Sequence, residues 1–139
     1  MASASEIYHR AIQTLAQEAV GAGRLDHPSG TAFLDNPLCG DCVDMQVDVR
    51  ESRIHAIGHK VRGCLLCRAS ASMIGKHALG ATHEDIARVA TAVGTFLREQ
   101  GPAPDDWPDL DLFTPVRGHA SRYSCVELPF KALLAALSK

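Results

Sequence analysis

Five cysteines are the residues of this sequence best suited to chemistry, and four of them form two C-x2-C pairs. Cys39 and Cys42 make the first pair, Cys64 and Cys67 make the second, and Cys125 stands apart. An odd number of cysteines, behind an N-terminus without the pattern of a secretory signal, argues against a disulfide framework. Thiols that the cytosol keeps reduced are, when clustered, more often metal ligands or reactive groups. The cysteines therefore predict a metal or thiol site in a cytoplasmic protein.

Spacing alone allows two interpretations of the pairs. Twenty-one residues separate Cys42 from Cys64, as in a zinc ribbon, where four thiolates enclose a structural Zn²⁺. This alternative is an interaction module that uses Cys39, Cys42, Cys64 and Cys67. Against it, the chain is long enough to build a core without zinc, and Cys67 lies within a helical pattern. The other alternative is a thiol redox enzyme, but neither pair lies in the βαβ setting that such a motif requires.

The residues around the cysteines form longer motifs. Residues 36–41 read N-P-L-C-G-D, and residues 63–73 read G-C-L-L-C-R-A-S-A-S-M. In combination these motifs resemble the U-type iron–sulfur scaffold family, which includes IscU, SufU and the N-terminal domain of NifU. The resemblance extends from about residue 5 to the C-terminus. The added stretch before the last cysteine, with its Pro/Asp-rich segment, is most similar to the SufU branch.

The resemblance implies a metal site formed by Cys39, Asp41, Cys64 and Cys125. It also implies a scaffold that accepts sulfur from a cysteine desulfurase and passes sulfur or a transient iron–sulfur cluster to apo iron–sulfur proteins. By this resemblance Cys39 is the first candidate for the sulfur acceptor and Cys125 the second, and bound zinc organises the site. Such a protein is a partner that undergoes chemistry rather than an enzyme acting alone. The implied fold is α+β, with a small antiparallel three-stranded sheet packed against several helices.

The chemistry of these residue types agrees with that ligand set. Thiolates suit Zn²⁺ or an iron–sulfur cluster, whereas the carboxylate of Asp41 is a harder and more easily exchanged ligand. Gly40 and Gly63 lie beside two of the ligands and would let the backbone approach a metal closely. Cys125 is expected immediately before the last helix, where the helix dipole would help to keep it a thiolate.

The chain also departs from the family pattern. The residue before Cys125 is Ser124, where IscU-like members have histidine and SufU-like members commonly have lysine. A hydroxyl is a poor metal ligand, and nearby His119 is interpreted as a surface imidazole. Cys42 and Cys67 lie outside the family set; inert packing, a spare thiol for sulfur relay and a replacement ligand all remain open for them.

Hydrophobic periodicity predicts the elements that must position these residues. The α+β order is a helix, three short strands and then helices. Ser3 or Ser5 is expected to cap the first helix, and Thr82 is expected to cap the helix 83–97. A bulge or late start is expected near Ile54. The predicted helices are 5–20, 65–79, 83–97 and a terminal one containing Phe130, Leu133, Leu134 and Leu137. The predicted strands are 31–34, 43–49 and 54–61. Residues 101–115, with four prolines and four aspartates, are expected to form a surface loop.

Length and composition limit the remaining possibilities. The 139 residues are 46% hydrophobic, which suits a single domain, 1–139, with its own core. The 14 basic and 16 acidic residues give a net charge of −2, so no basic footprint for nucleic acid is expected. No apolar run approaches the roughly 20 residues that cross a bilayer. We therefore expect no nucleic-acid or membrane partner.

Overall fold

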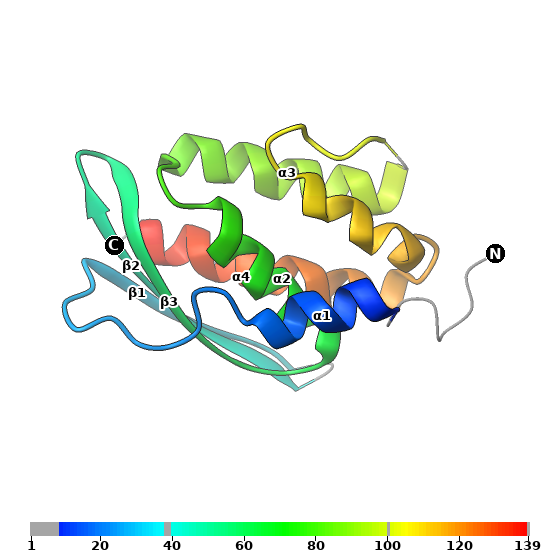
Figure 1. Cartoon of the computed structure of the whole chain (residues 1–139), viewed down its shortest axis with the longest axis horizontal. Coiled ribbons are helices and arrows are strands. Elements are labelled where there is room, and N and C mark those ends of the chain that lie inside the picture. The colour runs from blue at the N-terminus through cyan, green and yellow to red at the C-terminus, as the bar shows by residue number, and fades with distance from the viewer. Residues whose placement is uncertain (1–8, 38–39, 100, 139) are drawn as a thin grey trace.

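The computed structural model describes residues 9–37, 40–99 and 101–138. Three strands form one antiparallel sheet in the order β1-β2-β3, and the helices lie to one side of it (Figure 1). This arrangement confirms the predicted α+β class with a three-stranded sheet. In chain order the elements are α1 (Arg10–Glu18), β1 (Gly30–Asn36), β2 (Asp41–Arg50), β3 (Arg53–Arg62), α2 (Leu65–His77), α3 (His83–Glu99), the 3₁₀ helices η2 (Pro108–Val116) and η3 (Ala120–Arg122), and α4 (Tyr123–Leu137).

Alternation along β2 decides which face of the sheet is buried. Val43, Met45 and Val47 are fully buried in the core, because side chains two residues apart share a face. The predicted irregularity near Ile54 is present: Asp48 pairs with Ala56 and Val49 with Ile54, so one residue of β3 between them has no partner. All three strands are longer than predicted, because cross-strand pairing continues into polar residues at their ends.

The helix α4 packs against both the sheet and other helices. It packs on β1, β2, α2 and α3, and its buried residues include Phe130, Leu133 and Ala136. The expectation that Cys125 precedes this helix is wrong, since Cys125 is the third residue of α4. Pro129 lies inside the helix and has no backbone N–H, so it cannot donate the usual helical hydrogen bond to the carbonyl of Cys125.

The predicted surface loop at 101–115 is wrong in its second half. There the chain forms η2, and Trp107, Leu110, Phe113 and Val116 are buried. Their spacing of three matches the three residues per turn of a 3₁₀ helix, which places every third side chain on one face. The prolines and aspartates of η2 lie between these buried positions. Asp109 also accepts a hydrogen bond from His77 Nε2 at 2.8 Å, which ties η2 to the end of α2.

Helix ends follow local capping chemistry. Thr82 Oγ1 accepts from the N–H of Asp85 at 3.1 Å, and Asp85 Oδ2 accepts from the N–H of Thr82 at 3.0 Å. This capping box confirms Thr82 as the N-cap of α3. The first helix is capped by His9, whose Nδ1 accepts from the N–H of Ala11. The capping residues predicted for it, Ser3 and Ser5, lie outside the described residues.

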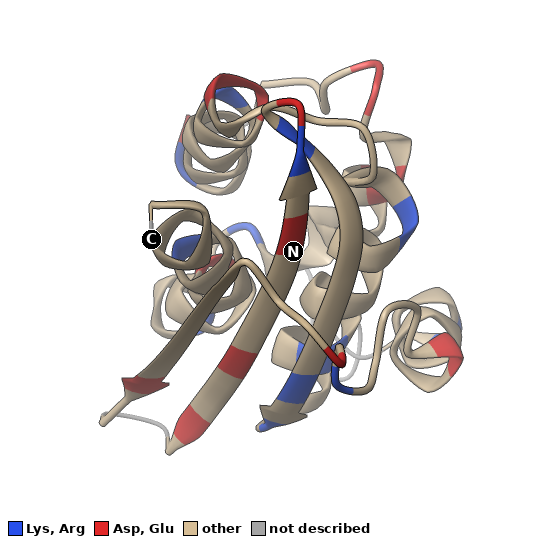
Figure 2. Ribbon diagram, turned by 90° about the vertical axis from the view of Figure 1, so that its left-hand side faces the viewer, with Lys and Arg blue, Asp and Glu red and all other residues tan. Residues whose placement is uncertain are grey.

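Charge and length of the elements bear on possible partners. On the side drawn in Figure 2, Lys and Arg are interspersed with Asp and Glu rather than gathered into one patch. Among the described residues, no helix combines the length and the apolar character needed to span a bilayer.

Candidate metal site

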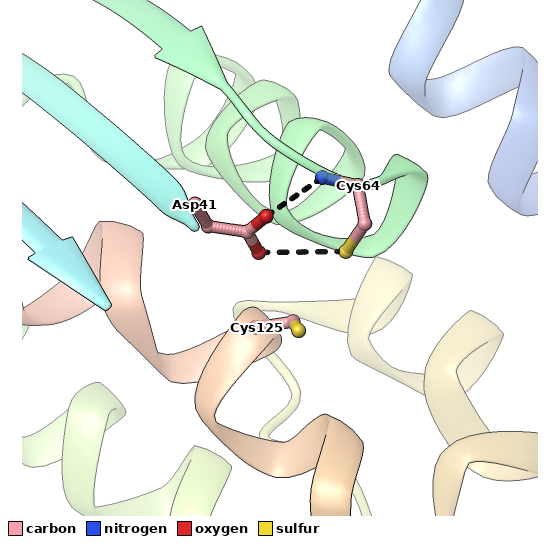
Figure 3. Close-up of side chains that lie close together, drawn as sticks. All are labelled: Asp41, Cys64 and Cys125. Atoms are coloured by element: carbon pink, nitrogen blue, oxygen red, sulfur yellow. Dashed lines mark hydrogen bonds between the residues drawn. The ribbon is translucent and has the colours of Figure 1, made fainter. Parts of the chain in front are cut away.

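Three side chains with metal-ligating atoms meet at one end of the sheet. The ligand atoms of Asp41, Cys64 and Cys125 all lie within 4.8 Å of one another. Asp41 begins β2, Cys64 caps the N-terminus of α2, and Cys125 lies in the first turn of α4. Figure 3 shows these side chains pointing toward one another from the three elements. Residues distant in sequence therefore come together where a strand end and two helix N-termini converge.

The carboxylate of Asp41 is held by the start of α2. Asp41 is only 3% exposed, on the same face of β2 as Val43. Its Oδ1 accepts a hydrogen bond from the backbone N–H of Cys64 at 3.0 Å, and its Oδ2 accepts from the Cys64 thiol at 3.5 Å (Figure 3). One carboxylate oxygen is thus fixed by the backbone, which leaves the other directed at the thiols.

Gly63 is required by the position of this carboxylate. A Cβ built on Gly63 would lie 2.8 Å from both Cγ and Oδ1 of Asp41, a separation that forces one of them to move. The sequence suggested that glycine would admit the backbone to a metal, whereas the structure shows that Gly63 makes room for the carboxylate of Asp41. Gly40 has a φ of 76°, a conformation that strains residues with a Cβ.

Burial sets the protonation of Cys125. Its side chain is fully buried. Burial first, and then the proximity of Cys64 and Asp41, raise the pKa of the Cys125 thiol far above its usual range. Burial therefore acts against the expected stabilisation of the thiolate by the helix N-terminus, whose dipole is worth about 0.3–1 kcal/mol. A cation among these groups would reverse the effect, since an opposite charge favours the thiolate.

The remaining predicted ligand, Cys39, lies outside the described residues. The N–H of Gly40, the residue after Cys39, donates to the carbonyl of Asn36 at 2.8 Å. Membership of Cys39 in the ligand set stays a prediction.

The other two cysteines are not part of this cluster. Cys42 is half-buried and lies between two inward-facing neighbours on β2, so it faces the opposite side of the sheet from Asp41. Cys67 is fully buried in the hydrophobic core. Among the described residues, neither these cysteines nor His119 join the group of ligand atoms. The zinc-ribbon alternative, which needs Cys42, Cys64 and Cys67 to converge, is not supported by this arrangement.

Sequence reasoning assigned no role to a polar contact beside the site. Asn36 Nδ2 donates a hydrogen bond to Ser124 Oγ at 2.8 Å, across 88 residues of sequence. In the sequence, Asn36 is the first residue of the N-P-L-C-G-D motif, and Ser124 is a departure from the family pattern. The motif position of Asn36 was the available signal, but its partner is set by the fold.

Comparison with known proteins agrees with the geometry. The family model for the NifU-like N-terminal domain matches residues 7–110. The chain belongs to this family. An iron–sulfur cluster assembly scaffold protein IscU of Streptococcus pyogenes serotype M1 is 27% identical over 107 residues, which cover 76% of this chain and 67% of that protein. These findings place the chain among the U-type scaffolds.

Solved structures support the same placement. A NifU-like N-terminal domain from Brucella abortus is 29% identical, with a TM-score of 0.90 over 96% of this chain and 94% of that one. A protein from Fervidobacterium islandicum AW-1, assigned as an iron–sulfur scaffold of the SUF system, is 19% identical with a TM-score of 0.87, over 97% of this chain and 99% of that one. At that identity the second likeness concerns the fold alone.

Proposed function

We propose that this scaffold-family protein receives sulfur from a cysteine desulfurase and passes on either the sulfur or a transient iron–sulfur cluster. The observation that carries the proposal is the convergence of Asp41, Cys64 and Cys125 within 4.8 Å. Two thiols and one carboxylate from three separate elements form an incomplete ligand set, which Cys39, two residues before Asp41, can complete. The cytoplasm, where thiols stay reduced, is the compartment in which we expect it to act.

The donor set suits zinc or an iron–sulfur cluster. Thiolates are preferred ligands of both, and a single carboxylate is the ligand most easily exchanged. Cys39, Asp41, Cys64 and Cys125 would hold the group, which when bound supplies the positive charge that stabilises thiolates. The N–H of Cys64 donates a hydrogen bond to one carboxylate oxygen of Asp41. This supports a ligand that would bind the metal through its other oxygen and would keep a hydrogen-bond partner when the metal leaves.

Sulfur transfer to this chain is a thiol exchange without net oxidation. The acceptor thiolate attacks the outer sulfur of the donor persulfide, a new S–S bond forms, the donor S–S bond breaks, and the donor cysteine leaves as a thiolate. Exposure bears on which cysteine accepts. Cys125 is fully buried and its pKa is raised, and both properties slow such an attack. These properties support Cys125 as the second candidate only, and Cys39 is proposed as the first acceptor by resemblance to the SufU branch.

Transfer of labelled sulfur tests the proposal. A cysteine desulfurase is supplied with ³⁵S-cysteine and mixed with the wild-type protein, Cys39→Ser, Cys125→Ser and the control Cys42→Ser. We expect non-reducing gels to show label on the wild type and Cys42→Ser but not on Cys39→Ser. Label passing onward to an apo iron–sulfur protein would establish the recipient class. Equal labelling of Cys39→Ser and wild type would overturn Cys39 as acceptor, and no labelling of wild type would overturn sulfur transfer.

A further inference from the structure

The outer edge of β3 is covered along only part of its length. The segment that follows α1 lies beside β3 (Figure 1), where Ala22 pairs with His59 in a parallel bridge. The N–H of His59 donates to the carbonyl of Gly21 at 3.0 Å, and the N–H of Gly23 donates to the carbonyl of His59 at 2.9 Å. Beyond Gly23 the chain turns onto the sheet, where the N–H of Leu25 donates to a side chain of β2 at 2.7 Å. The cover of this edge therefore ends at His59.

Val61 is the next position at which the backbone of β3 faces this edge. Both backbone groups of His59 bond to the segment after α1, so they point away from β2. Val61 lies two residues further along, opposite Val43 in the register, and alternation along the strand directs its N–H and C=O to the same edge. Among the described residues, neither group forms a hydrogen bond outside the sheet. An open strand edge of this kind is a template for pairing with another chain.

A cavity of about 390 Å³ lies against this open edge. Val61 lines it from β3, and Ala16, Ala19 and Ala22 line it from α1 and the segment that follows. Small apolar side chains therefore form the wall that faces the open backbone. Such a wall leaves space for an extended segment whose own side chains on that face are small and apolar.

Three cationic side chains, those of Arg24, Lys60 and Arg68, line the same cavity. Arg24 forms an ion pair at 3.6 Å with Asp44, which lies opposite Lys60 on β2. Lys60 and Arg68 are exposed, and within the described ranges neither has an ion-pair partner. Carboxylates on an occupant would complement these charges, whereas a second copy of the chain at the same edge would bring like charges together. The charges thus favour an acidic partner.

We propose that the β3 edge at Val61 binds an extended acidic segment of a partner protein as an added strand. Backbone hydrogen bonds to Val61 hold the segment, its small apolar side chains enter the cavity, and its carboxylates meet the cations at the rim. Val61 lies three residues before Cys64, and the N–H of Arg68 donates to the carbonyl of Cys64 at 3.1 Å. The bound segment therefore lies beside a turn that carries a candidate metal ligand. The inference goes beyond the proposed function, because strand addition requires neither metal nor sulfur transfer.

A fluorescein-labelled peptide of four Val-Glu repeats is a suitable probe, because alternate side chains of a strand lie on opposite faces. Fluorescence anisotropy at low salt measures its binding to the wild-type protein. A peptide of four Val-Lys repeats should bind at least about tenfold more weakly. Methylation of the central peptide nitrogens of the Val-Glu peptide removes the donors of an added strand and should also weaken binding about tenfold, the effect of losing two hydrogen bonds.

Charge reversal of exposed residues tests the rim without disturbing the core. Lys60→Glu and Arg68→Glu should each bind the Val-Glu peptide about fivefold more weakly, and high salt should reduce the difference from wild type. Lys131→Glu is the matched control, because Lys131 is an exposed lysine on α4 and does not line this cavity. It should bind as wild type does. Circular dichroism of each variant verifies that it folds.

Amide hydrogen exchange followed by NMR tests the strand edge itself. In the free protein the N–H of Val61 should exchange rapidly although it lies within β3, whereas the N–H of His59, which is bonded to Gly21, should be protected. Saturation with the Val-Glu peptide should slow exchange at Val61 about tenfold. The exchange rate at His59 should not change.

Each outcome either supports or overturns the inference. No binding of the Val-Glu peptide by wild type, or equal binding of its methylated form, would overturn strand addition. Equal binding of the Val-Lys peptide, or an equal loss in Lys131→Glu, would overturn selection by the cations. Protection of Val61 in the free protein that increases with protein concentration would assign the edge to a second copy and overturn the acidic partner. Transfer of labelled sulfur is measured separately, so failure here leaves the proposed function standing.

Discussion

His59 should make the protein less stable as the pH falls from 7.5 to 5.5. The ring is only 4% exposed, and its Nε2 lies 2.8 Å from the carbonyl oxygen of Val20. Burial lowers the pKa of His59 below its usual 6.5, although hydrogen bonds to the carbonyls of Val20 and Ala71 oppose that shift. The unfolded chain therefore binds the proton more tightly than the folded protein does.

The sign and size of the effect follow from that difference. Below the unfolded pKa of about 6.5, protonation favours the unfolded state, so stability falls with pH until the lower folded pKa is reached. The slope within this interval is at most about 1.4 kcal/mol per pH unit. The free energy of unfolding should therefore drop between pH 6.5 and 5.5 on account of this one residue, by at most about 1 kcal/mol.

Urea denaturation followed by circular dichroism at pH 7.5, 6.5 and 5.5 measures the effect. His59→Gln keeps a donor for the Val20 carbonyl but does not titrate, so its stability should vary less with pH than that of wild type. His27→Gln is the matched control, because His27 is exposed, and it should retain the wild-type slope. An identical pH dependence in wild type and His59→Gln would refute this reasoning.

Three further predictions concern single residues. Burial raises the pKa of Asp109, but the hydrogen bonds from His77 and Lys76 outweigh burial and lower it overall. Asp109→Asn should therefore reduce the free energy of unfolding by about 1 kcal/mol above pH 4, as measured by urea denaturation. Equal stabilities of variant and wild type there would contradict the role of Asp109 in tying η2 to α2. With Asp41 proposed as the labile ligand, a reconstituted cluster on Asp41→Ala should persist longer and transfer more slowly, as followed by visible absorbance, and faster loss would oppose that role. Gly63→Ala places a Cβ 2.8 Å from the Asp41 carboxylate, so Co²⁺ affinity should fall, and wild-type affinity would show that the carboxylate can move freely.

Local patterns predicted most of the regular elements. The alternation of Val43, Met45 and Val47 identified β2, and the phase change at Ile54 indicated the bulge that the register contains. Thr82 was predicted as the N-cap of α3, and the structure adds its capping partner Asp85, three residues further along the chain. Such features depend on neighbours in sequence, which is why one sequence is sufficient to find them.

Features decided by tertiary contacts were missed or wrong. The 3₁₀ helix η2 lies in a segment rich in proline and aspartate, and its burial depends on Trp107 and Phe113 finding space against other elements. The opposite faces of Asp41 and Cys42 follow from strand register, which spacing between cysteines does not reveal. The raised pKa of Cys125 depends on its burial beside Cys64 and Asp41, and the partnership of Asn36 with Ser124 depends on where α4 crosses β1.

Metal content of the five single Cys→Ser variants tests the central claim most directly. Each variant is purified in parallel and its bound zinc and iron are measured per chain by mass spectrometry. The account predicts that Cys39→Ser, Cys64→Ser and Cys125→Ser lose metal, whereas Cys42→Ser, on the opposite sheet face, and Cys67→Ser, in the core, retain it if they fold. Full retention of metal by Cys125→Ser together with its loss from Cys42→Ser would contradict the account.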